Sequence, residues 1–368
     1  MRRSQPSTGG LRGALGTVLL GLVCAGAASL TMAQVPPDTG GTAPTQALRI
    51  VGGLAGVNQY TRHESPFWRE RLSALTAGRY TAEIVPFDRA GIRGAELLTM
   101  VRLGSLPFGT LLLSQASPRD AELAAPDLAG LSPDIATLRR VVTAWRPHLT
   151  TLLRERHGAE LLAVYAYPAQ VLFCNRPVAS LAGLQGLRVR TSSPTQSDFI
   201  RALGGLPLTV PFAQLVGNMQ SGNMECAITG TMSGYTIGLH EITSHLLPLP
   251  VTWGLSVFVA NRAHWQSLPQ DLRAVLLREL PLLERAIWDE AERETDEGVR
   301  CSTGSGPCTA GPPGRMKLQP PATSDDGLRR TLFAREVLPQ WVGRCGEPCA
   351  AAWNQWLAPV SGVMATGR

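Results

Sequence analysis

The first part of the chain alternates short apolar runs typical of strands with segments of helical periodicity. The strand-like runs cover 48–51, 81–87 and 108–113, and the helical segments cover 66–78 and 94–103. Pro66 is expected at the first position of the first helix, which Gly78 ends. The order strand, helix, strand, helix, strand predicts a parallel or mixed sheet. Residues 117–133 are then loop-rich, and 135–156 have the pattern of a helix.

A second unit with the same alternation begins near Glu160. Its strand-like runs lie at 161–166, 171–174, 187–190, 208–210, 224–228, 246–251 and 255–259, and its helical segments lie at 196–203 and 212–221. Residues 271–300 follow as a long helix with one apolar side and charge opposite. A Cys-, Gly- and Pro-rich loop and a terminal helical section complete the chain.

The first 33 residues have the composition of a secretory signal peptide. Arginines precede an apolar run at 14–30, and a small-residue cleavage site ends at Ala33. Residues 34–46 are rich in Pro, Gly and Thr and are expected to be a disordered lead-in. We therefore expect a soluble, exported protein of about 335 residues with two domains. Lipidation of Cys24 is the alternative, but the residue before it is bulkier than such sites favour.

The formal charge of +6 does not by itself predict a nucleic-acid partner. Lys317 is the only lysine, and arginines supply the rest of the 34 basic residues. These arginines are interspersed with acids, and the sequence has no basic stripe interleaved with aromatic residues. The composition indicates genome bias rather than nucleic-acid binding.

Six of the seven cysteines follow the signal segment. An even number in an exported chain favours disulfides over metal ligation, although many connectivities are possible. We predict the local pairs Cys301–Cys308 and Cys345–Cys349, which leaves Cys174 with Cys226. Because the spacings do not match zinc knuckles and no histidine accompanies them, no metal or cofactor is expected.

Arg190 is the candidate ligand anchor. It ends a strand-like run in which Leu187 and Val189 face one side and Arg188 and Arg190 face the other. A turn follows it, and open α/β sheets bind ligands at the C-terminal ends of their strands. A planar guanidinium there can hold a carboxylate through two parallel hydrogen bonds. This short segment alone fits a surface arginine equally well.

Three enzyme patterns fail on spacing or composition. Gly52, Gly53 and Gly56 resemble half of a dinucleotide fingerprint but lack its spacing, so a βα loop at the mouth of a cleft is preferred. His240 and His245 are five residues apart, whereas a zinc-protease helix needs them four apart, and we assign both to a surface helix end. There is no GxSxG elbow and no acid cluster, so we expect no catalytic residues and no enzymatic activity.

A longer pattern resembles a known family. It consists of Arg176 to Val178, Ser180 to Arg190, Gly204 to Pro207, Pro211 to Leu215 and Met219 to Glu225. These segments are similar to the periplasmic solute-binding proteins of tripartite ATP-independent periplasmic (TRAP) transporters, the DctP-type family, and the resemblance covers roughly residues 47–300. It implies an α/β fold with a two-domain periplasmic-binding-protein architecture (type II-like, Venus flytrap), crossing strands and a long bracing helix.

This architecture implies a division of the chain into parts. The expected parts are a signal peptide (1–33), a disordered lead-in (34–46), domain I (47–159 and about 253–270), domain II with the carboxylate anchor (160–252), a bracing helix (271–300), a Cys/Gly/Pro-rich loop (301–327) and a C-terminal helical section (328–368).

The resemblance also implies the ligand-binding residues. Arg190 matches the arginine that pairs with the ligand carboxylate, Ser193 matches a polar residue just beyond it, and Phe212 matches an aromatic that packs on the ligand. Thr229 stands where sialic-acid-binding members have an asparagine, and Gln170 stands where they have a second arginine.

The departures from the family pattern narrow the ligand. With Gln170 in place of a second cation, Arg190 is the only cation expected in the pocket, which favours a monocarboxylate. Leu112 occupies a position that is acidic in the sialic-acid-binding members, so no acid is expected there to meet an ammonium group. Ser233 offers a further hydroxyl, and Trp253 either walls the pocket or packs at the hinge.

We therefore predict a TRAP solute-binding protein that captures a small organic acid by domain closure around Arg190, with loops at 54–63 and 87–93 closing over the ligand. The expected partners are this ligand and a membrane permease, and the protein is expected to be a monomer. A binding protein of another uptake or sensing system is the alternative, and an exported hydrolase is less favoured. The sequence leaves open the ligand's identity and whether a metal ion assists binding.

Overall fold

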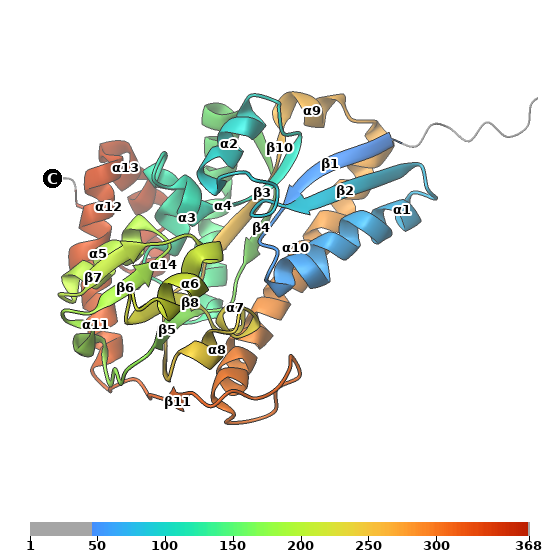
Figure 1. Cartoon of the computed structure of the whole chain (residues 1–368). Coiled ribbons are helices and arrows are strands. Elements are labelled where there is room, and N and C mark those ends of the chain that lie inside the picture. Colours follow the sequence, from blue (N-terminus) through green and yellow to red (C-terminus); the bar gives the residue numbers. More distant parts are fainter. Residues whose placement is uncertain (1–45, 367–368) are drawn as a thin grey trace, which may run out of the picture. The chain divides into compact units, whose positions relative to one another are not determined.

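The computed structural model describes residues 46–366, which contain two mixed sheets and many helices (Figure 1). The predicted signal peptide, and the lead-in up to residue 45, lie outside the described residues. Across 46–366, none of the helices has the length and apolar character that a membrane span requires.

The first sheet is formed mainly by the N-terminal part of the described chain. Its strands, in spatial order, are β2 (Tyr80–Pro86), β1 (Gln46–Gly52), β3 (Phe108–Leu112), β10 (Leu255–Asn261) and β4 (Ala159–Ala166). Strand β1 is parallel to β2 and β3, whereas β10 is antiparallel to β3 and β4. The predicted order of strands and helices in this part is confirmed, and the sheet is mixed.

The first helical run begins earlier than predicted. It comprises η1 (Gln59–Glu64), η2 (Phe67–Arg71) and α1 (Leu72–Leu75). Pro66 therefore lies inside the run and not at its start. The N–H of Ser65 donates to the carbonyl of Tyr60, five residues earlier, which is the wide turn of a π-helix. We infer that this wide turn tolerates Pro66 inside the helical run, although proline has no backbone N–H to donate.

The remaining helices of this part lie between its strands or after β10. They are α2 (Gly94–Arg102), α3 (Leu113–Ala116), η3 (Ala121–Asp127), α4 (Ile135–His157) and α9 (Arg262–Ser267). The segment predicted to be loop-rich, 117–133, thus contains the 3-10 helix η3, which ends at Asp127.

The second sheet presents three parallel strand ends at one edge. Its strands, in spatial order, are β11 (Lys317–Leu318), β9 (His245–Thr252), β5 (Gln170–Cys174), β8 (Cys226–Gly230), β6 (Arg188–Thr191) and β7 (Leu206–Thr209). Its helices are η4 (Leu181–Leu184), α5 (Pro194–Ala202), η5 (Phe212–Gln214), α6 (Leu215–Gln220), α7 (Thr231–Thr236) and α8 (Leu239–Ile242). Strand β6 is parallel to β7 and β8, so the residues that follow these three strands gather at one edge.

The chain crosses between the sheets at 167–169, after β4, and at 253–254, after β9. Strand β4 pairs with β10 in the first sheet, although its residues fall almost wholly in the range 160–252 expected for domain II. Sheet membership therefore puts the first crossing near residue 167 and not near 160. An apolar strand does not reveal in its pattern which of two sheets it joins, which explains the difference.

Each sheet and the helices beside it form one unit of the structure. Helix α10 (Gln270–Thr303) packs against elements of both units: β4 and η1 in the first, and α7 and β9 in the second. Its buried apolar residues Leu272, Leu276, Leu280, Leu283 and Ile287 belong to the core of the first sheet. Near its other end Gly298 lies against the backbone of α7, where a Cβ at 298 would be 2.2 Å from the amide nitrogen of Met232. The predicted long bracing helix is therefore present.

The C-terminal helices cover α4 and α5 (Figure 1). They are α11 (Asp325–Leu332), η6 (Phe333–Val337), α12 (Leu338–Cys345), α13 (Glu347–Trp356) and α14 (Ala358–Ser361). All three predicted disulfides are present: Cys174–Cys226, Cys301–Cys308 and Cys345–Cys349. The first of them joins the end of β5 to the start of β8, so it lies at the opposite end of β8 from the edge where the strand ends gather.

Candidate functional site

Arg190 is a buried cation near the C-terminal end of β6. Its side chain is 3% exposed, and burial lowers its pKa to about 10. Nε donates to the carbonyl of Val210 at 2.9 Å, and Nη1 donates to the carbonyl of Ile228 at 2.7 Å. Within 46–366, Nη2 has no hydrogen-bond partner and no carboxylate forms an ion pair with the guanidinium. Because a buried charge is costly without an opposite charge, this arrangement suits an anion.

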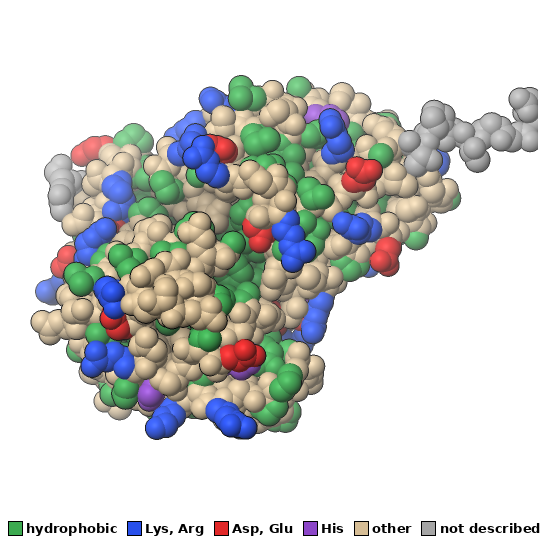
Figure 2. All heavy atoms as spheres, in the orientation of Figure 1, with side chains coloured by type: hydrophobic (Ala, Val, Ile, Leu, Met, Phe, Trp, Pro, Cys, Tyr) green, Lys and Arg blue, Asp and Glu red, His purple; other side chains and the backbone are tan. Residues whose placement is uncertain are grey.

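Arg188, on the same strand, differs from Arg190 because it has a carboxylate partner. Its guanidinium pairs with the carboxylate of Glu225, and its side chain is 43% exposed. This pair satisfies both charges at the surface. Figure 2 shows other basic side chains scattered over the visible face and not gathered into a stripe.

A small cleft lies beside the strand ends of the second sheet. The residues that line it come from both units: Leu113, Ser114, Ala124, Asp127, Gln170, Ser192, Ser193, Thr195, Gln196, Thr252 and Gly254. Two of the predicted ligand-binding residues, Gln170 and Ser193, are among them. Arg190 does not line the cleft itself, but it precedes the lining residue Ser192 by two positions.

Ser193 is the N-cap of α5. Its Oγ accepts a hydrogen bond from the backbone N–H of Gln196 at 3.1 Å. Since Ser193 and Thr195 both line the cleft, the N-terminus of α5 opens onto it. The unpaired N–H groups and the dipole of a helix N-terminus favour negative charge. This end of the cleft therefore suits an anionic group.

A relay of hydrogen bonds fixes the orientation of the Gln170 amide. The backbone N–H of Ser192 can only donate, and it donates to Oε1 of Gln196 at 2.8 Å. Nε2 of Gln196 therefore faces the other way and donates to Oε1 of Gln170 at 2.6 Å. The hydroxyl of Thr252 donates to the same oxygen at 3.1 Å. Nε2 of Gln170 has no partner among the described residues, so its N–H groups are available to a ligand.

Asp127 supplies an acid to the same cleft. Its Oδ1 accepts from the backbone N–H of Trp253 at 3.0 Å, and its Oδ2 accepts from that of Gly254 at 2.8 Å. Burial raises the pKa of Asp127 to about 7 against the effect of these two hydrogen bonds. The family resemblance pointed to position 112 for an acid, which is a leucine in this chain, and it did not indicate Asp127. No local pattern marks Asp127, because only the fold of η3 brings it to the cleft.

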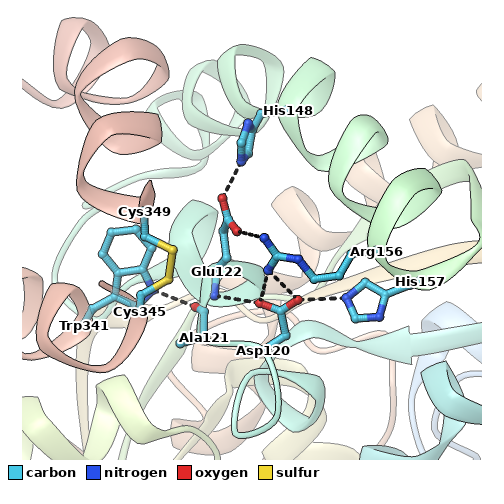
Figure 3. Close-up of a disulfide and its surroundings, with 9 residues drawn as sticks. All are labelled: Asp120, Ala121, Glu122, His148, Arg156, His157, Trp341, Cys345 and Cys349. Atoms are coloured by element: carbon cyan, nitrogen blue, oxygen red, sulfur yellow. Dashed lines mark hydrogen bonds and ion pairs between the residues drawn. A yellow bond between two sulfur atoms is a disulfide. The ribbon is translucent and has the colours of Figure 1, made fainter. Parts of the chain in front are cut away.

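An ionic network fixes the start of η3, as Figure 3 shows. Arg156 pairs with Asp120 at 3.0 Å and with Glu122 at 2.8 Å. His157 contacts Asp120 at 2.8 Å, and His148 contacts Glu122 at 2.6 Å. The hydrogen bond from His148 lowers the pKa of Glu122. Burial opposes the ionisation of Asp120, but His157 and Arg156 outweigh it and lower its pKa.

The C-terminal helices hold the same segment from another side. Nε1 of Trp341 donates to the carbonyl of Ala121 at 2.6 Å, next to the Cys345–Cys349 disulfide (Figure 3). Helix η3 is thus anchored near its start, and Asp127 lies at its other end. These contacts position Asp127 against the crossing at 253–254.

Four other predicted residues do not line the cleft. Phe212 lies near Gly56, where a Cβ at 56 would be 4.0 Å from its ring. Thr229 is buried in β8, and its hydroxyl has no partner within the described residues. Ser233 lines a separate small cavity. Nε1 of Trp253 donates to the carbonyl of Ser132 at 3.0 Å, which agrees with packing at the hinge.

The loop after β1 contacts the second unit. The carbonyl of Gly56 accepts a hydrogen bond from the hydroxyl of Thr236 at 3.0 Å. The carboxylate of Asp88 accepts from the backbone N–H of Ala55 at 3.1 Å, so the second predicted closing loop supports the first. Residues 59–63, which were expected to belong to the closing loop, are helical in η1.

The two histidines of the rejected protease motif lie on different elements. His240 is on α8, where its ring stacks on that of Tyr235 with centroids 4.4 Å apart. His245 begins β9 and is buried, so its assignment to a surface helix end was wrong. A strand that begins directly after a short helix is not visible in the apolar pattern.

The chain matches a known family over most of its length. The model of the bacterial extracellular solute-binding proteins, family 7 (DctP), matches residues 55–300. The ectoine-binding periplasmic protein TeaA of Halomonas elongata is 26% identical over 123 residues. That alignment spans 32% of this chain and only 35% of TeaA.

Solved structures resemble the whole described fold. DctP7, a Bordetella pertussis extracytoplasmic solute receptor that binds pyroglutamic acid, is similar with a TM-score of 0.75 at 20% identity. The match covers 85% of this chain and 99% of the receptor. A TRAP periplasmic solute-binding protein of Desulfovibrio salexigens with bound orotic acid gives a TM-score of 0.75 at 13% identity, and the match covers 86% of this chain and 99% of that protein. These likenesses confirm the predicted two-domain periplasmic-binding-protein fold.

Proposed function

Because this chain belongs to the DctP family of periplasmic solute-binding proteins that serve TRAP transporters, we propose that it captures a small organic acid and delivers it to a membrane permease. In this proposal residues 1–33 direct export to the periplasm and are then cleaved off, and the mature protein works as a monomer. Binding is followed by closure of the two units around the ligand.

The observation that carries the proposal is the state of Arg190. Its guanidinium is 3% exposed, donates to two backbone carbonyls and has no carboxylate partner among the described residues. A ligand carboxylate would neutralise this charge and accept from Nη2. Removing one partner of such a charge-assisted pair, shielded from water, typically costs about 2–5 kcal/mol. A micromolar dissociation constant needs about 8 kcal/mol in total.

The neutral Gln170 supports a monocarboxylate. Its amide donates hydrogen bonds but carries no charge, so it cannot balance a second carboxylate as an arginine would. Asp127, in the same cleft, disfavours a second negative charge when it is ionised. Among the similar proteins, DctP7 binds pyroglutamic acid, which has one carboxylate, and we extend this ligand type to the present chain.

Ser193, Phe212, Thr229, Ser233 and Trp253 complete the proposed ligand-binding set. Ser193 would act through the N-terminus of α5, and the hydroxyls of Thr229 and Ser233 have no partner within the described residues. Phe212 and Trp253 would shape the walls, one near the closing loop and one at the hinge.

A screen for ligand-induced thermal shifts tests this function. The mature protein is heated with each of a panel of small carboxylates, and a ligand at about 100 times its dissociation constant adds about 2.7 kcal/mol of stability. We expect one or more monocarboxylates to raise the midpoint and to be recovered unchanged. A chain that responds to no carboxylate, or that converts its ligand, does not have the proposed function.

A further inference from the structure

Beyond the capture of a carboxylate, we propose that Asp127 and Gln170 together bind an amide group of the ligand. The ligand would then be a carboxylic acid that also carries a lactam or carboxamide, with its carboxylate on Arg190. This inference rests on the proposed function, since it concerns the other end of the same ligand.

The donor is the amide nitrogen of Gln170. Its Oε1 is occupied by hydrogen bonds from Gln196 at 2.6 Å and from Thr252 at 3.1 Å. The relay that begins at the backbone N–H of Ser192 prevents the amide from turning over. Gln170 therefore offers only N–H groups to the cleft, and these need an acceptor such as a carbonyl oxygen.

The acceptor is the carboxylate of Asp127. Each of its oxygens takes one backbone hydrogen bond, from Trp253 or from Gly254. A carboxylate oxygen has two lone pairs, so each oxygen retains capacity for a further donor. No side chain among the described residues donates to it. A ligand N–H would fill this capacity.

Donor and acceptor lie on either side of one residue, Gly254. Its N–H donates to Asp127 at 2.8 Å, and a Cβ on Gly254 would lie 2.6 Å from Nε2 of Gln170. The N–H and C=O of a lactam or primary amide point the same way from adjacent atoms. Such a group can donate to Asp127 and accept from Gln170 at once.

The charges in the cleft favour an amide over a second carboxylate or an ammonium group at this end of the ligand. Burial, and not Arg190, dominates the pKa of Asp127, and burial alone lowers that of Arg190, so the two charges do not neutralise each other directly. A second ligand carboxylate would be repelled by ionised Asp127. An ammonium group would satisfy Asp127 but would leave the N–H groups of Gln170 without an acceptor. The amide satisfies both.

Three probes of matched ring size test the inference by calorimetry. The first is 5-oxopyrrolidine-2-carboxylate (pyroglutamate), which has both the N–H and the C=O. The second is 3-oxocyclopentane-1-carboxylate, which lacks the N–H. The third is pyrrolidine-2-carboxylate, which lacks the C=O and has an ammonium group in place of the amide nitrogen. We expect the lactam to bind at least about 10-fold more tightly than either of the others, as one hydrogen bond to a charged or buried group implies. Equal binding of the lactam and the ketone overturns the inference and leaves the proposed function intact.

Two variants separate the two ends of the ligand. Asp127→Asn should reduce the affinity for the lactam to that for the ketone while leaving the ketone unchanged, whereas Arg190→Ala should weaken all three probes alike. A loss of lactam preference in Arg190→Ala alone contradicts the assignment to Asp127.

The wild-type protein gives a test that does not depend on how Asp127→Asn folds. Because the carboxylate of Asp127 titrates at about pH 7, the preference for the lactam should fade as the pH falls below that value. A preference that does not change between about pH 8 and about pH 5.5 speaks against Asp127 as the acceptor. If no probe binds, mass spectrometry of the ligand released on heating decides. An acid with an amide supports the inference, and an acid without nitrogen overturns it.

Discussion

Gln196, which is 1% exposed, donates its Nε2–H to Oε1 of Gln170 at 2.6 Å and thereby turns the nitrogen of Gln170 toward the cleft. The orientation of the Gln196 amide is itself fixed, because its Oε1 accepts from the backbone N–H of Ser192 at 2.8 Å. Gln196 thus determines which group of Gln170 faces the cleft.

Replacing Gln196 with glutamate should therefore weaken ligand binding. A glutamate still accepts from Ser192, but it cannot donate to Gln170, whose oxygen would lose its strongest partner and be free to turn toward the cleft. We expect a loss of about 1–3 kcal/mol, or about 5- to 150-fold in affinity, measured by calorimetry with the identified ligand. Gln214→Glu makes the same change at an exposed position and should bind normally. Unchanged affinity in Gln196→Glu contradicts the relay.

Arg190→Ala should abolish tight binding, with a loss of about 2–5 kcal/mol, because the ligand carboxylate loses its only charged partner. Arg190→Lys should recover little, since lysine lacks the planar fork. Arg188→Ala on the same strand removes an exposed ion pair with Glu225 and serves as the matched control. Thermal denaturation without ligand must show both variants folded. Normal binding by Arg190→Ala would refute the site assignment.

The sequence predicted the parts of the site that follow from local pattern. Arg190 falls at a strand end because apolar alternation and a turn mark that end. Ser193 was expected only from the family resemblance, as a polar residue just beyond Arg190, and the structure makes it the N-cap of α5. The three disulfides follow from spacing and parity. These features depend on neighbours along the chain.

The parts that were missed depend on neighbours in space. Asp127 reaches the cleft only because η3 packs on α4 through Arg156 and its partners. Gln196 faces inward on α5, but no rule of periodicity says that its amide meets Gln170. The membership of β4 in the first sheet is likewise a matter of pairing and not of pattern.

Gly254→Ala should impair both stability and binding. Its φ of +80° is unfavourable for a residue with a side chain, which costs about 1–2 kcal/mol. A Cβ there would also lie 2.6 Å from Nε2 of Gln170 and displace the amide. Gly222→Ala is the control, because Gly222 has φ of +71° and open space around it. Both variants should lose similar stability from strain, but only Gly254→Ala should lose ligand affinity. Equal affinities would show that Gln170 tolerates the displacement.

Gly298→Ala should loosen the brace between the two units. A Cβ at 298 would lie 2.2 Å from the backbone nitrogen of Met232, so α10 must shift away from α7. We expect urea denaturation to show a loss of about 1–3 kcal/mol, the usual cost of overpacking. Gly343→Ala, in helix α12 with nothing within contact distance, should instead gain up to about 1 kcal/mol from helix propensity. If both variants are stabilised, the contact is not tight.

The network at the start of η3 should make part of the stability pH-dependent. The hydrogen bond from His148 and the charge of Arg156 lower the pKa of Glu122 in the folded protein. A carboxylate whose pKa is lowered on folding stabilises the protein above its unfolded pKa, about 4.3, and the contribution is lost as the pH falls through the lowered folded value.

Glu122→Gln should therefore be less stable than the wild type at about pH 7, by about 1–3 kcal/mol, because a buried carboxylate with charged partners is replaced by a neutral amide. The difference should persist to about pH 5 and shrink below about pH 4, as measured by urea denaturation across this range. Glu241→Gln, at an exposed carboxylate, should stay close to the wild type throughout. A gap for Glu122→Gln that stays constant down to about pH 3 would mean that the residue acts through packing, because only an ionised carboxylate loses its contribution as it is protonated.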